Sequence, residues 1–329
     1  MPSLQYQISL GRTTLTPTSE AALVSLTTEA DLAIPVNACR LVVANPPTLA
    51  VGDAVEVKLG YDSAPQSVFK GEIAHLHWAF GGLKVEAVSH LWRLTTTHLN
   101  LLFEKSTAKA IAQAVAKRCQ VSVDKAEDGI QFPVYALGDH ISAYGHLRHL
   151  AEQCGFDLYG DRADKLVFAP YQPSQTHDFT YGVDILAYHW SQRPSPLTGV
   201  EVYGESPASQ GQGDKAYSWL TKKEVKGSSG KRSGTVLYRV EPTARTQAIA
   251  GTIATALLKT HQVQRQGWVT VLGNPATGLG DRLTLAKLPT AAHNGRYKIT
   301  GVRHRLSQKR GFCTTFQWQE EAYWIPSSA

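Results

Sequence analysis

A pattern of alternating apolar and polar residues occurs twice in this chain, and this repetition constrains the fold more than any other feature of the sequence. The first copy runs from Val51 to Ala87 and opens with Gly52-Asp53. The second runs from Leu279 to Phe316 and opens with Gly280-Asp281. Alternation with a period of two is typical of a half-buried strand, and glycine followed by aspartate suits a tight turn into such a strand.

An aromatic residue followed by lysine lies sixteen residues after the aspartate in both copies, as Phe69-Lys70 and as Tyr297-Lys298. Both copies also keep the same order of turn, strand, loop, strand and strand. Self-similarity of this kind predicts a duplicated β module. The alternative interpretation is that two unrelated antiparallel meanders share a common pattern.

Residues 1–95 contain further short alternating runs. Residues 3–10 read as a strand, as do the runs near Leu23 and Cys39, while the double proline at Pro46-Pro47 ends the pattern. About six short strands at close spacing are typical of a barrel or a sandwich. We therefore expect residues 1–95 to form the first β-barrel.

Residues 96–180 have the composition of a small α+β insert. Apolar residues at helical spacing predict helices over 107–119, capped by Ser106, and over 141–154, capped by Asp139 or Ser142. Gly155 stands where a glycine would end the second helix. A hairpin is expected over 156–168.

Residues 181–329 return to strand patterns and are expected to form a second β-barrel. Within them, 205–235 is rich in glycine and serine and is expected to be a long loop. A helix is expected after Pro242. The repeat's second copy follows, and an aromatic tail closes the chain.

Composition excludes several classes of protein. The chain has 329 residues, 43% of them apolar and 18% charged, as in ordinary globular proteins of two or three domains. No signal peptide or membrane-spanning run is visible, so synthesis in the cytoplasm is expected. The four cysteines form no Cys-x-x-Cys motif and are expected to be reduced. A net charge of +6 fits an anionic partner or acidic neighbouring subunits.

Three stretches, spread over nearly the whole chain, carry a family resemblance. They are Val51-Gly52-Asp53 with Phe69-Lys70-Gly71-Glu72-Ile73, then His146 to Phe156, and then Leu279-Gly280-Asp281 with Asn294 to Ile299 and Val302-Arg303-His304. In this order they resemble the phage tail hub family known as late control protein D, and the hub half of VgrG-type spike proteins. VgrG proteins continue into a β-helical spike, whereas here the spike is expected to be a separate polypeptide.

The resemblance implies a mainly β fold with an α+β insert and two tail-tube-like β-barrels per chain. Three chains would then present six barrels in a pseudo-six-fold ring. Such a homotrimer would be the baseplate hub of a contractile phage tail or tailocin, and it would adapt a three-fold spike protein to the six-fold tail tube. Other partners would be further baseplate proteins. Assembly would take place in the bacterial cytoplasm, without a membrane.

Two groups of basic residues could face a lumen or a partner. The first is the cluster of Lys222, Lys223, Lys226, Lys231 and Arg232, and the second is the turn from Arg303 to Arg310. Contacts of such residues with the phosphates of nucleic acid cargo would be independent of sequence and sensitive to salt. The alternative is a solvated loop and a charged hairpin tip that discourages edge pairing.

The aromatic residues Trp318, Tyr323 and Trp324 are candidates for an interface. Tryptophan and tyrosine are favoured anchors in protein–protein contacts, which predicts that this tail docks on another subunit or a baseplate protein. The alternative is that the tail folds back on its own barrel.

No catalytic, cofactor or metal motif is evident. His146 and His149 share a helical face with His140 nearby, and His75 and His77 share a strand face, but no carboxylate or cysteine completes a metal signature. A glycine-rich run at 211–216 lies in a polar loop rather than at a strand-to-helix turn, so it does not predict dinucleotide binding. We therefore expect a structural hub and no enzyme or cofactor. The alternatives are a baseplate-associated cell-wall hydrolase and a nucleic-acid-binding barrel protein.

Overall fold

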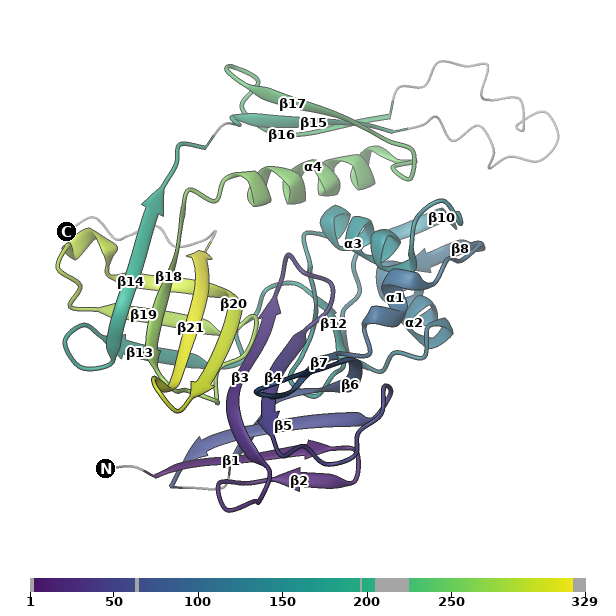
Figure 1. The fold of residues 1–329 in the computed structure, drawn as a ribbon. Helices are drawn as coiled ribbons and strands as arrows, with labels where there is room; N and C mark the ends of the chain where they lie inside the picture. The colour runs from purple at the N-terminus through teal and green to yellow at the C-terminus, as the bar shows by residue number, and fades with distance from the viewer. Residues whose placement is uncertain (1–2, 63–64, 196, 205–224, 322–329) are drawn as a thin grey trace.

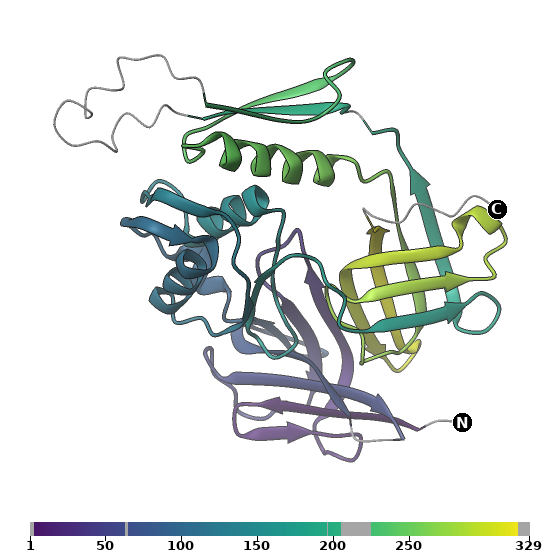
Figure 2. The same ribbon diagram turned by 180° about the vertical axis from the view of Figure 1, so that it is seen from behind.

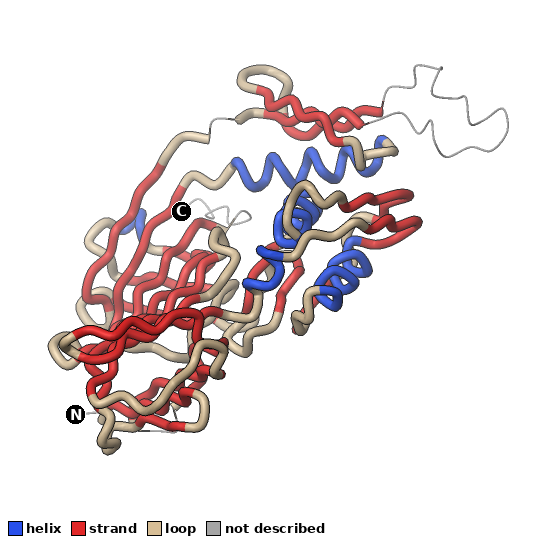
Figure 3. The backbone as a smooth tube through the Cα atoms, turned by 45° about the vertical axis from the view of Figure 1, so that its right-hand side comes forward, coloured by secondary structure: helices blue, strands red, loops and turns tan. Residues whose placement is uncertain are grey.

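The computed structural model describes residues 3–62, 65–195, 197–204 and 225–321, which fold into two β modules and one α+β unit (Figure 1). The purple strands of the first β module lie on one side of the second β module, and Figure 2 shows the same arrangement from behind. The α-helices gather in the α+β unit, away from the N-terminal strands (Figure 3).

The first β module contains seven strands and one apolar core. Its strands lie hydrogen-bonded in the order β3-β4-β7-β6-β5-β1-β2. They are β1 (Leu4–Leu10), β2 (Thr13–Leu15), β3 (Ala22–Asp31), β4 (Ala38–Ala44), β5 (Ala54–Tyr61), β6 (Gln66–Ala79) and β7 (Gly82–Val88). Alternate residues of these strands, among them Val55, Val57 and Leu59, are buried in the core, as the period of two predicts.

The second β module has its strands in the order β14-β18-β21-β20-β19-β13. They are β13 (Thr176–Thr180), β14 (Ile185–Gln192), β18 (Arg265–Leu272), β19 (Arg282–Ala286), β20 (Gly295–Ser307) and β21 (Gly311–Glu320), with a short 3-10 turn, η2 (Ala291–His293). Its core contains the buried aromatic residues Phe316 and Trp318.

The two β modules repeat one strand order, which confirms the predicted duplication. Strands β3, β4, β7, β6, β5 and β1 correspond in turn to β14, β18, β21, β20, β19 and β13. A β-bulge follows Ile73 in β6 and Ile299 in β20, and another follows Leu23 in β3 and Ile185 in β14. Coincidence of two irregularities is stronger support than strand order alone, because a bulge is a local feature of one register. The modules differ in that β1 runs antiparallel to β5, whereas β13 runs parallel to β19.

The Gly-Asp turns occupy equivalent places, but the aromatic–lysine pairs do not. The Gly52 amide donates to the Ile73 carbonyl at 2.8 Å, and the Gly280 amide donates to the Ile299 carbonyl at 3.2 Å. Both glycines have positive φ, +91° and +77°, a conformation that glycine adopts readily. The equivalence of Ile73 and Ile299 aligns Tyr297 with Gly71 rather than with Phe69. The prediction that the two aromatic–lysine pairs are structurally equivalent is therefore wrong by two residues, because strand pairing and not spacing along the chain decides which residues correspond.

One strand of each module joins the two modules edge to edge. Residues Gly301–Ser307 of β20 pair antiparallel with Ser25–Asp31 of β3. This β3–β20 joint makes one thirteen-stranded sheet out of both modules. The hydrogen-bonded order of the described strands is open-ended, so the two closed barrels that the sequence predicts are not formed within this part of the chain.

The α+β unit is assembled from two separate stretches of chain. The first supplies α1 (Trp92–Thr96), β8 (Leu101–Thr107), α2 (Ala108–Arg118), β9 (Val123–Ala126), β10 (Gln131–Leu137), α3 (Ala143–Cys154), β11 (Asp157–Gly160) and β12 (Leu166–Ala169). The second supplies β15 (Gly199–Gly204), β16 (Val225–Gly230), β17 (Val236–Glu241) and α4 (Gln247–His261).

Both stretches share one core, so the predicted division at residue 181 is wrong. Val200 and Val202 of β15 and Leu257 of α4 belong to the same buried cluster as Leu147 and Leu150 of α3. Residues 176–180 belong instead to the second β module, because β13 pairs with β19. The second β module is thus interrupted between β14 and β18 by residues that pack elsewhere.

The predicted helices are present, with small corrections at their ends. The Thr107 hydroxyl, rather than Ser106, accepts from the Ala110 amide to cap α2. Ser142 caps α3, and Gly155 ends it in the left-handed conformation. None of the helices in the described ranges is long and apolar enough to cross a membrane.

Part of the predicted loop at 205–235 forms a strand. Residues Val225–Gly230 form β16, which pairs with β15. Residues 205–224 lie outside the described part of the chain.

Candidate functional site

The β3–β20 joint shows how the edges of this sheet accept another strand. On the face that carries the cores, Leu26 of β3 and Leu306 of β20 lie opposite each other and are 1% and 5% exposed. On the uncovered face, Arg303 Nε lies 2.8 Å from Glu29 Oε1. The joint thus combines backbone hydrogen bonds, apolar burial and an ion pair, which are the contacts of an ordinary protein interface.

The uncovered face of the thirteen-stranded sheet is polar and ion-paired. Its charged residues on β3, β4, β7 and the half of β20 that pairs with β3 are Glu29, Asp31, Arg40, Lys84, Glu86, Arg303 and Arg305. Lys84 Nζ lies 2.6 Å from Glu86 Oε1, and this contact lowers the pKa of the Glu86 carboxyl. Four cations and three anions share this part of the face, so its charge is nearly balanced, which suits a solvated surface.

Several strand edges carry no partner strand among the described residues, and two of them belong to strands equivalent to those of the β3–β20 joint. One is the second half of β6, His75–Ala79, which pairs with β7 alone, because β5 pairs with β6 only as far as Glu72. The other is the outer edge of β14, which ends the sheet. Beside the first edge, Trp78 and Phe80 are 70% and 112% exposed. Large exposed apolar side chains next to unpaired backbone groups are typical of surfaces that bind another chain.

Two of the three described cations of the basic cluster predicted at 222–232 share one carboxylate. Glu201 of β15 lies 2.6 Å from Lys226 Nζ and 3.0 Å from Arg232 Nε. The hydrogen bond from Lys226 lowers the pKa of the Glu201 carboxyl. Lys231 is exposed on the turn that follows β16, whereas Lys222 and Lys223 lie outside the described residues.

The second basic stretch contains a buried histidine. Burial lowers the pKa of His304 from 6.5 to about 3, and the nearby Arg162 acts in the same direction. His304 Nδ1 lies 3.0 Å from the Thr314 hydroxyl. Arg303 is paired with Glu29, so Arg305, Lys309 and Arg310 are the exposed cations of this stretch.

Trp318 belongs to the core rather than to an exposed tail. It lies in β21, is 2% exposed, and packs against Tyr297 with ring centroids 4.1 Å apart. The strand pattern continues to Glu320, which corrects the expectation that the tail begins at residue 318. A side chain buried in its own module has almost no surface left for a partner. Tyr323 and Trp324 lie outside the described residues.

The paired histidines contact different groups. His146 Nε2 lies 2.7 Å from the Gly138 carbonyl oxygen, and burial lowers the pKa of His146. His149 Nε2 lies 3.2 Å from Glu241 Oε2, where it joins α3 to β17. His75 and His77 are exposed on β6. Over the described residues, no group of three or more histidine, cysteine or carboxylate side chains is arranged to hold a metal ion.

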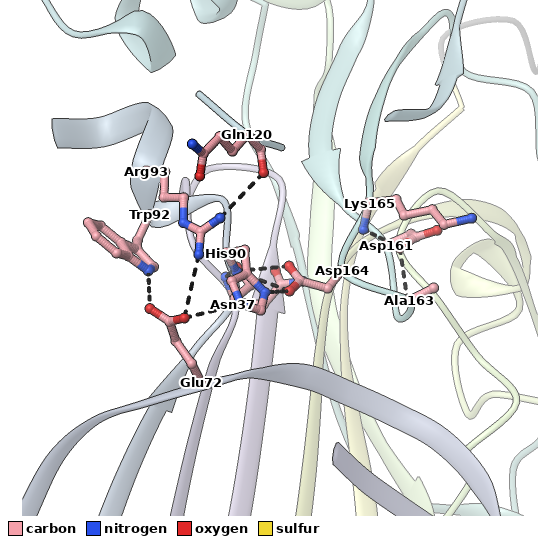
Figure 4. Close-up of polar contacts among 11 residues, drawn as sticks. Asn37, Glu72, His90, Trp92, Arg93, Gln120, Asp161, Ala163, Asp164 and Lys165 are labelled. Carbon is pink, nitrogen blue, oxygen red and sulfur yellow. Dashed lines mark hydrogen bonds and ion pairs between the residues drawn. The ribbon is translucent and has the colours of Figure 1, made fainter. Parts of the chain in front are cut away.

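A polar cluster that the sequence did not predict fastens the α+β unit to the first β module (Figure 4). His90 lies between two carboxylates: Nδ1 contacts Asp164 Oδ2, and Nε2 lies 3.1 Å from Glu72 Oε2. Glu72 also accepts from Trp92 Nε1 at 2.9 Å and lies 3.7 Å from Arg93. We refer to Glu72, His90, Trp92, Arg93 and Asp164 as the His90 cluster.

The His90 cluster is built to hold position. The His90 amide also donates to Asp164 Oδ1 at 2.9 Å, so the backbone and the side chain of His90 both bind the Asp164 carboxylate. Burial raises the pKa of Asp164, and the hydrogen bonds from His90 oppose this shift. The contacts of the cluster join Glu72 and Asp164 to the segment from His90 to Arg93, which is far from both in sequence, so no local motif could reveal the cluster.

A cleft of about 590 Å³ lies between the helices α3 and α4 and the strands β20 and β21. Two ion pairs lie in its walls: Lys298 Nζ contacts Asp157 Oδ1, and Arg282 Nε lies 2.7 Å from Glu321 Oε1. The cleft therefore lies between the α+β unit and the second β module.

Comparison with known proteins identifies the fold. No protein-family model and no curated protein sequence matches the chain. The crystal structure of the 43 kDa tail protein of prophage MuSo2 from Shewanella oneidensis matches with a TM-score of 0.74 at 13% identity, over 97% of this chain and 98% of that chain. The tail protein of Neisseria meningitidis MC58 matches with a TM-score of 0.74 at 16% identity, over 98% of both chains.

A type VI secretion component from E. coli, described as similar to bacteriophage T4 tail proteins, has a TM-score of 0.61 at 12% identity. It is matched over 98% of this chain and 79% of that chain. The chain therefore has the fold of phage tail proteins, as the resemblance in sequence predicted.

Proposed function

We propose that this chain is the structural hub of a contractile tail or tailocin baseplate. Three copies form a ring of six β modules that adapts a three-fold spike to the six-fold tail tube. The observation that carries the proposal is the β3–β20 joint, because it places two equivalent β modules side by side in one chain and in one sheet. Repetition of the same joint between chains generates a ring in which every module has similar neighbours.

The ring acts by shape rather than by chemistry. Its uncovered sheet face lines the channel, and its cores support that face from outside. The ion pairs of Arg40 and Arg303 with Glu29 cross strand boundaries on the channel face. They add little stability at an exposed surface, but they leave a lining on which cargo, including nucleic acid, finds few unpaired charges.

The α+β unit projects from the β modules and is held to the first one by the His90 cluster. In the proposed hub it is the part that contacts further baseplate proteins. The partners are a second and third copy of the chain, a spike protein, and the tail tube protein. The protein is assembled in the bacterial cytoplasm and acts without enzymatic activity.

The proposal is tested by the mass in solution. Light scattering of the purified chain, alone and with its co-encoded spike protein, should give three times the chain mass of 35.9 kDa, or a monomer that becomes trimeric on addition of the spike. Negative-stain images of the trimer should show a ring with six lobes. A monomer that ignores the spike would overturn the proposal. Assays of salt-dependent DNA binding and of cell-wall clearing would then decide between the alternatives.

A further inference from the structure

The duplication places β3 and β14 in equivalent positions, but only β3 has a partner on its outer edge. Strand β3 pairs with the second half of β20. The equivalent of β20 is β6, and the equivalent half of β6 has an unpaired edge among the described residues. The equivalent of β3 is β14, whose outer edge is also unpaired there. The chain thus carries one completed joint and the two halves of a second.

The side chains beside the unpaired edge of β6 have the character of a buried contact. Alignment of the bulges after Ile73 and Ile299 matches Trp78 with His304 and Phe80 with Leu306. His304 and Leu306 are 3% and 5% exposed in the β3–β20 joint. Trp78 and Phe80 are 70% and 112% exposed. Trp78 and Phe80 are thus large apolar side chains exposed to solvent. They occupy positions that are buried beside a paired strand in the other module.

We propose that β14 of one subunit pairs antiparallel with the second half of β6, His75–Ala79, in the next subunit. This inference rests on the proposed trimer and specifies the surface through which its subunits meet. The occupant is a second copy of this chain, because the β3–β20 joint already shows the same two kinds of strand paired. Three such joints alternate with the three internal joints and close the ring.

The internal joint fixes the register of the proposed one. In the β3–β20 joint Arg303 lies opposite Glu29, and His304 lies opposite Thr28. The bulges after Leu23 and Ile185 align Glu29 with Ser191 and Thr28 with Trp190. Transfer of the register therefore places His77 opposite Ser191, and Trp78 opposite Trp190, on the two faces of the proposed joint.

The predicted neighbours are chemically suited to each other. Trp78 meets Trp190, and in the same register Phe80 meets Tyr188, so two aromatic pairs form on the face that carries the cores. Cross-strand aromatic pairs stabilise antiparallel sheets. Trp190 already stacks on His293 with centroids 4.1 Å apart, which holds one partner in place before the subunits meet. On the uncovered face His77 and Ser191 bring together no like charges.

Disulfide cross-linking tests the register. In a Cys313→Ser background, the chain carrying His77→Cys and Ser191→Cys should form covalent dimers and trimers under mild oxidation, and reductant should return them to single chains. Opposite residues in antiparallel strands have Cα atoms about 4.5–5.5 Å apart, within the range of a disulfide. The matched control carries His75→Cys and Ser191→Cys, shifted by two residues, and should remain uncross-linked.

The outcomes separate this inference from the proposed function. A trimer that cross-links only through the shifted pair, or through neither pair, overturns the β6–β14 joint while the hub remains. The absence of any trimer overturns the hub itself.

A second pair of variants tests the surface without cysteines. Trp78→Lys should shift the trimer to monomer by at least tenfold in dissociation constant and leave the unfolding midpoint of the monomer unchanged, because Trp78 is exposed within its own chain. The control is Tyr238→Lys on β17, which is 65% exposed and lies in a different sheet. Trimerisation by Trp78→Lys at the wild-type dissociation constant would overturn the inference.

Discussion

Trp318 of β21 lies opposite Gly267 of β18, at the place where the first β module has Ala87 opposite Cys39. At this pair of positions the second module thus combines a very large side chain with a glycine, whereas the first combines two small side chains. A side chain at Gly267 is excluded, since its Cβ would lie 2.6 Å from Trp318 Cζ2 and 2.0 Å from the His189 carbonyl oxygen. The largest side chain of the second core therefore depends on a glycine in the neighbouring strand.

Gly267→Ala should destabilise the second β module by several kcal/mol, because the backbone of β14 and the Trp318 ring must both move. Denaturant unfolding followed by tryptophan fluorescence measures the change. The matched control is Gly251→Ala in α4, where an added Cβ meets nothing within 4 Å. It should stabilise the protein by about 0.5–1 kcal/mol. Equal effects of the two substitutions would contradict the packing described.

Trp318 and the residues after it should behave differently on removal. Trp318→Ala should cost about 3–5 kcal/mol of stability, because it opens a cavity in the core. Deletion of residues 322–329 removes Tyr323 and Trp324, which we propose as contacts with another baseplate protein. We expect it to leave the unfolding midpoint unchanged and to weaken assembly. Pull-down of baseplate partners measures this, and normal assembly of the shortened chain would exclude these aromatics as anchors.

Buried His304 should make the second β module sensitive to acid. Burial holds the pKa of His304 at about 3, against 6.5 in the unfolded chain. Above pH 6.5 both states are neutral there. As the pH falls below 6.5, His304 becomes protonated in the unfolded state but stays neutral in the folded state. The free energy of unfolding should therefore decrease by about 1.4 kcal/mol per pH unit between these values.

Unfolding titrations of His304→Gln at several pH values check this expectation. In this variant the free energy of unfolding should decrease less steeply as the pH falls. In His261→Gln, at an exposed position, it should decrease as steeply as in the wild type. An unchanged slope in His304→Gln would show that other groups cause the acid sensitivity.

The His90 cluster should control how firmly the α+β unit is held. His90→Ala removes the partner of Asp164, whose side chain is 7% exposed, and leaves its carboxylate buried with fewer donors. Loss of one such partner costs about 1–3 kcal/mol. Hydrogen exchange should accelerate at β11, β12 and α1. His98→Ala, at an exposed position, is the control, and the same exchange pattern in both variants would argue against the described role.

The sequence was sufficient to predict elements that depend on local chemistry. The helix stripes, the Ser142 cap and the Gly155 terminus follow from neighbouring residues. The duplication was also detectable, because the Gly-Asp turns require their residue types. The aromatic–lysine spacing predicts an alignment that is off by two residues, because the first module has more residues between its turn and Ile73 than the second has between its turn and Ile299.

Features that depend on long-range pairing were not predictable. Nothing near Val200 or Leu257 indicates that they pack with α3, because an amphipathic strand or helix specifies a buried face without specifying its partner. The same limit applies to the β3–β20 joint, whose strands are more than 250 residues apart. The sequence pattern assigns Trp318 to a tail because β21 continues past the recognisable repeat.

The β3–β20 joint also bears on how quickly a ring could form. Six separate modules would have to meet in one event or in a series of weak intermediates, with a rate that falls steeply on dilution. Fusion of neighbouring modules in one chain makes half of the contacts intramolecular, where the effective concentration is fixed by the chain and does not vary with expression level. Three chains need only two encounters, after which the third joint of the proposed ring closes within the complex, whereas six separate modules would need five.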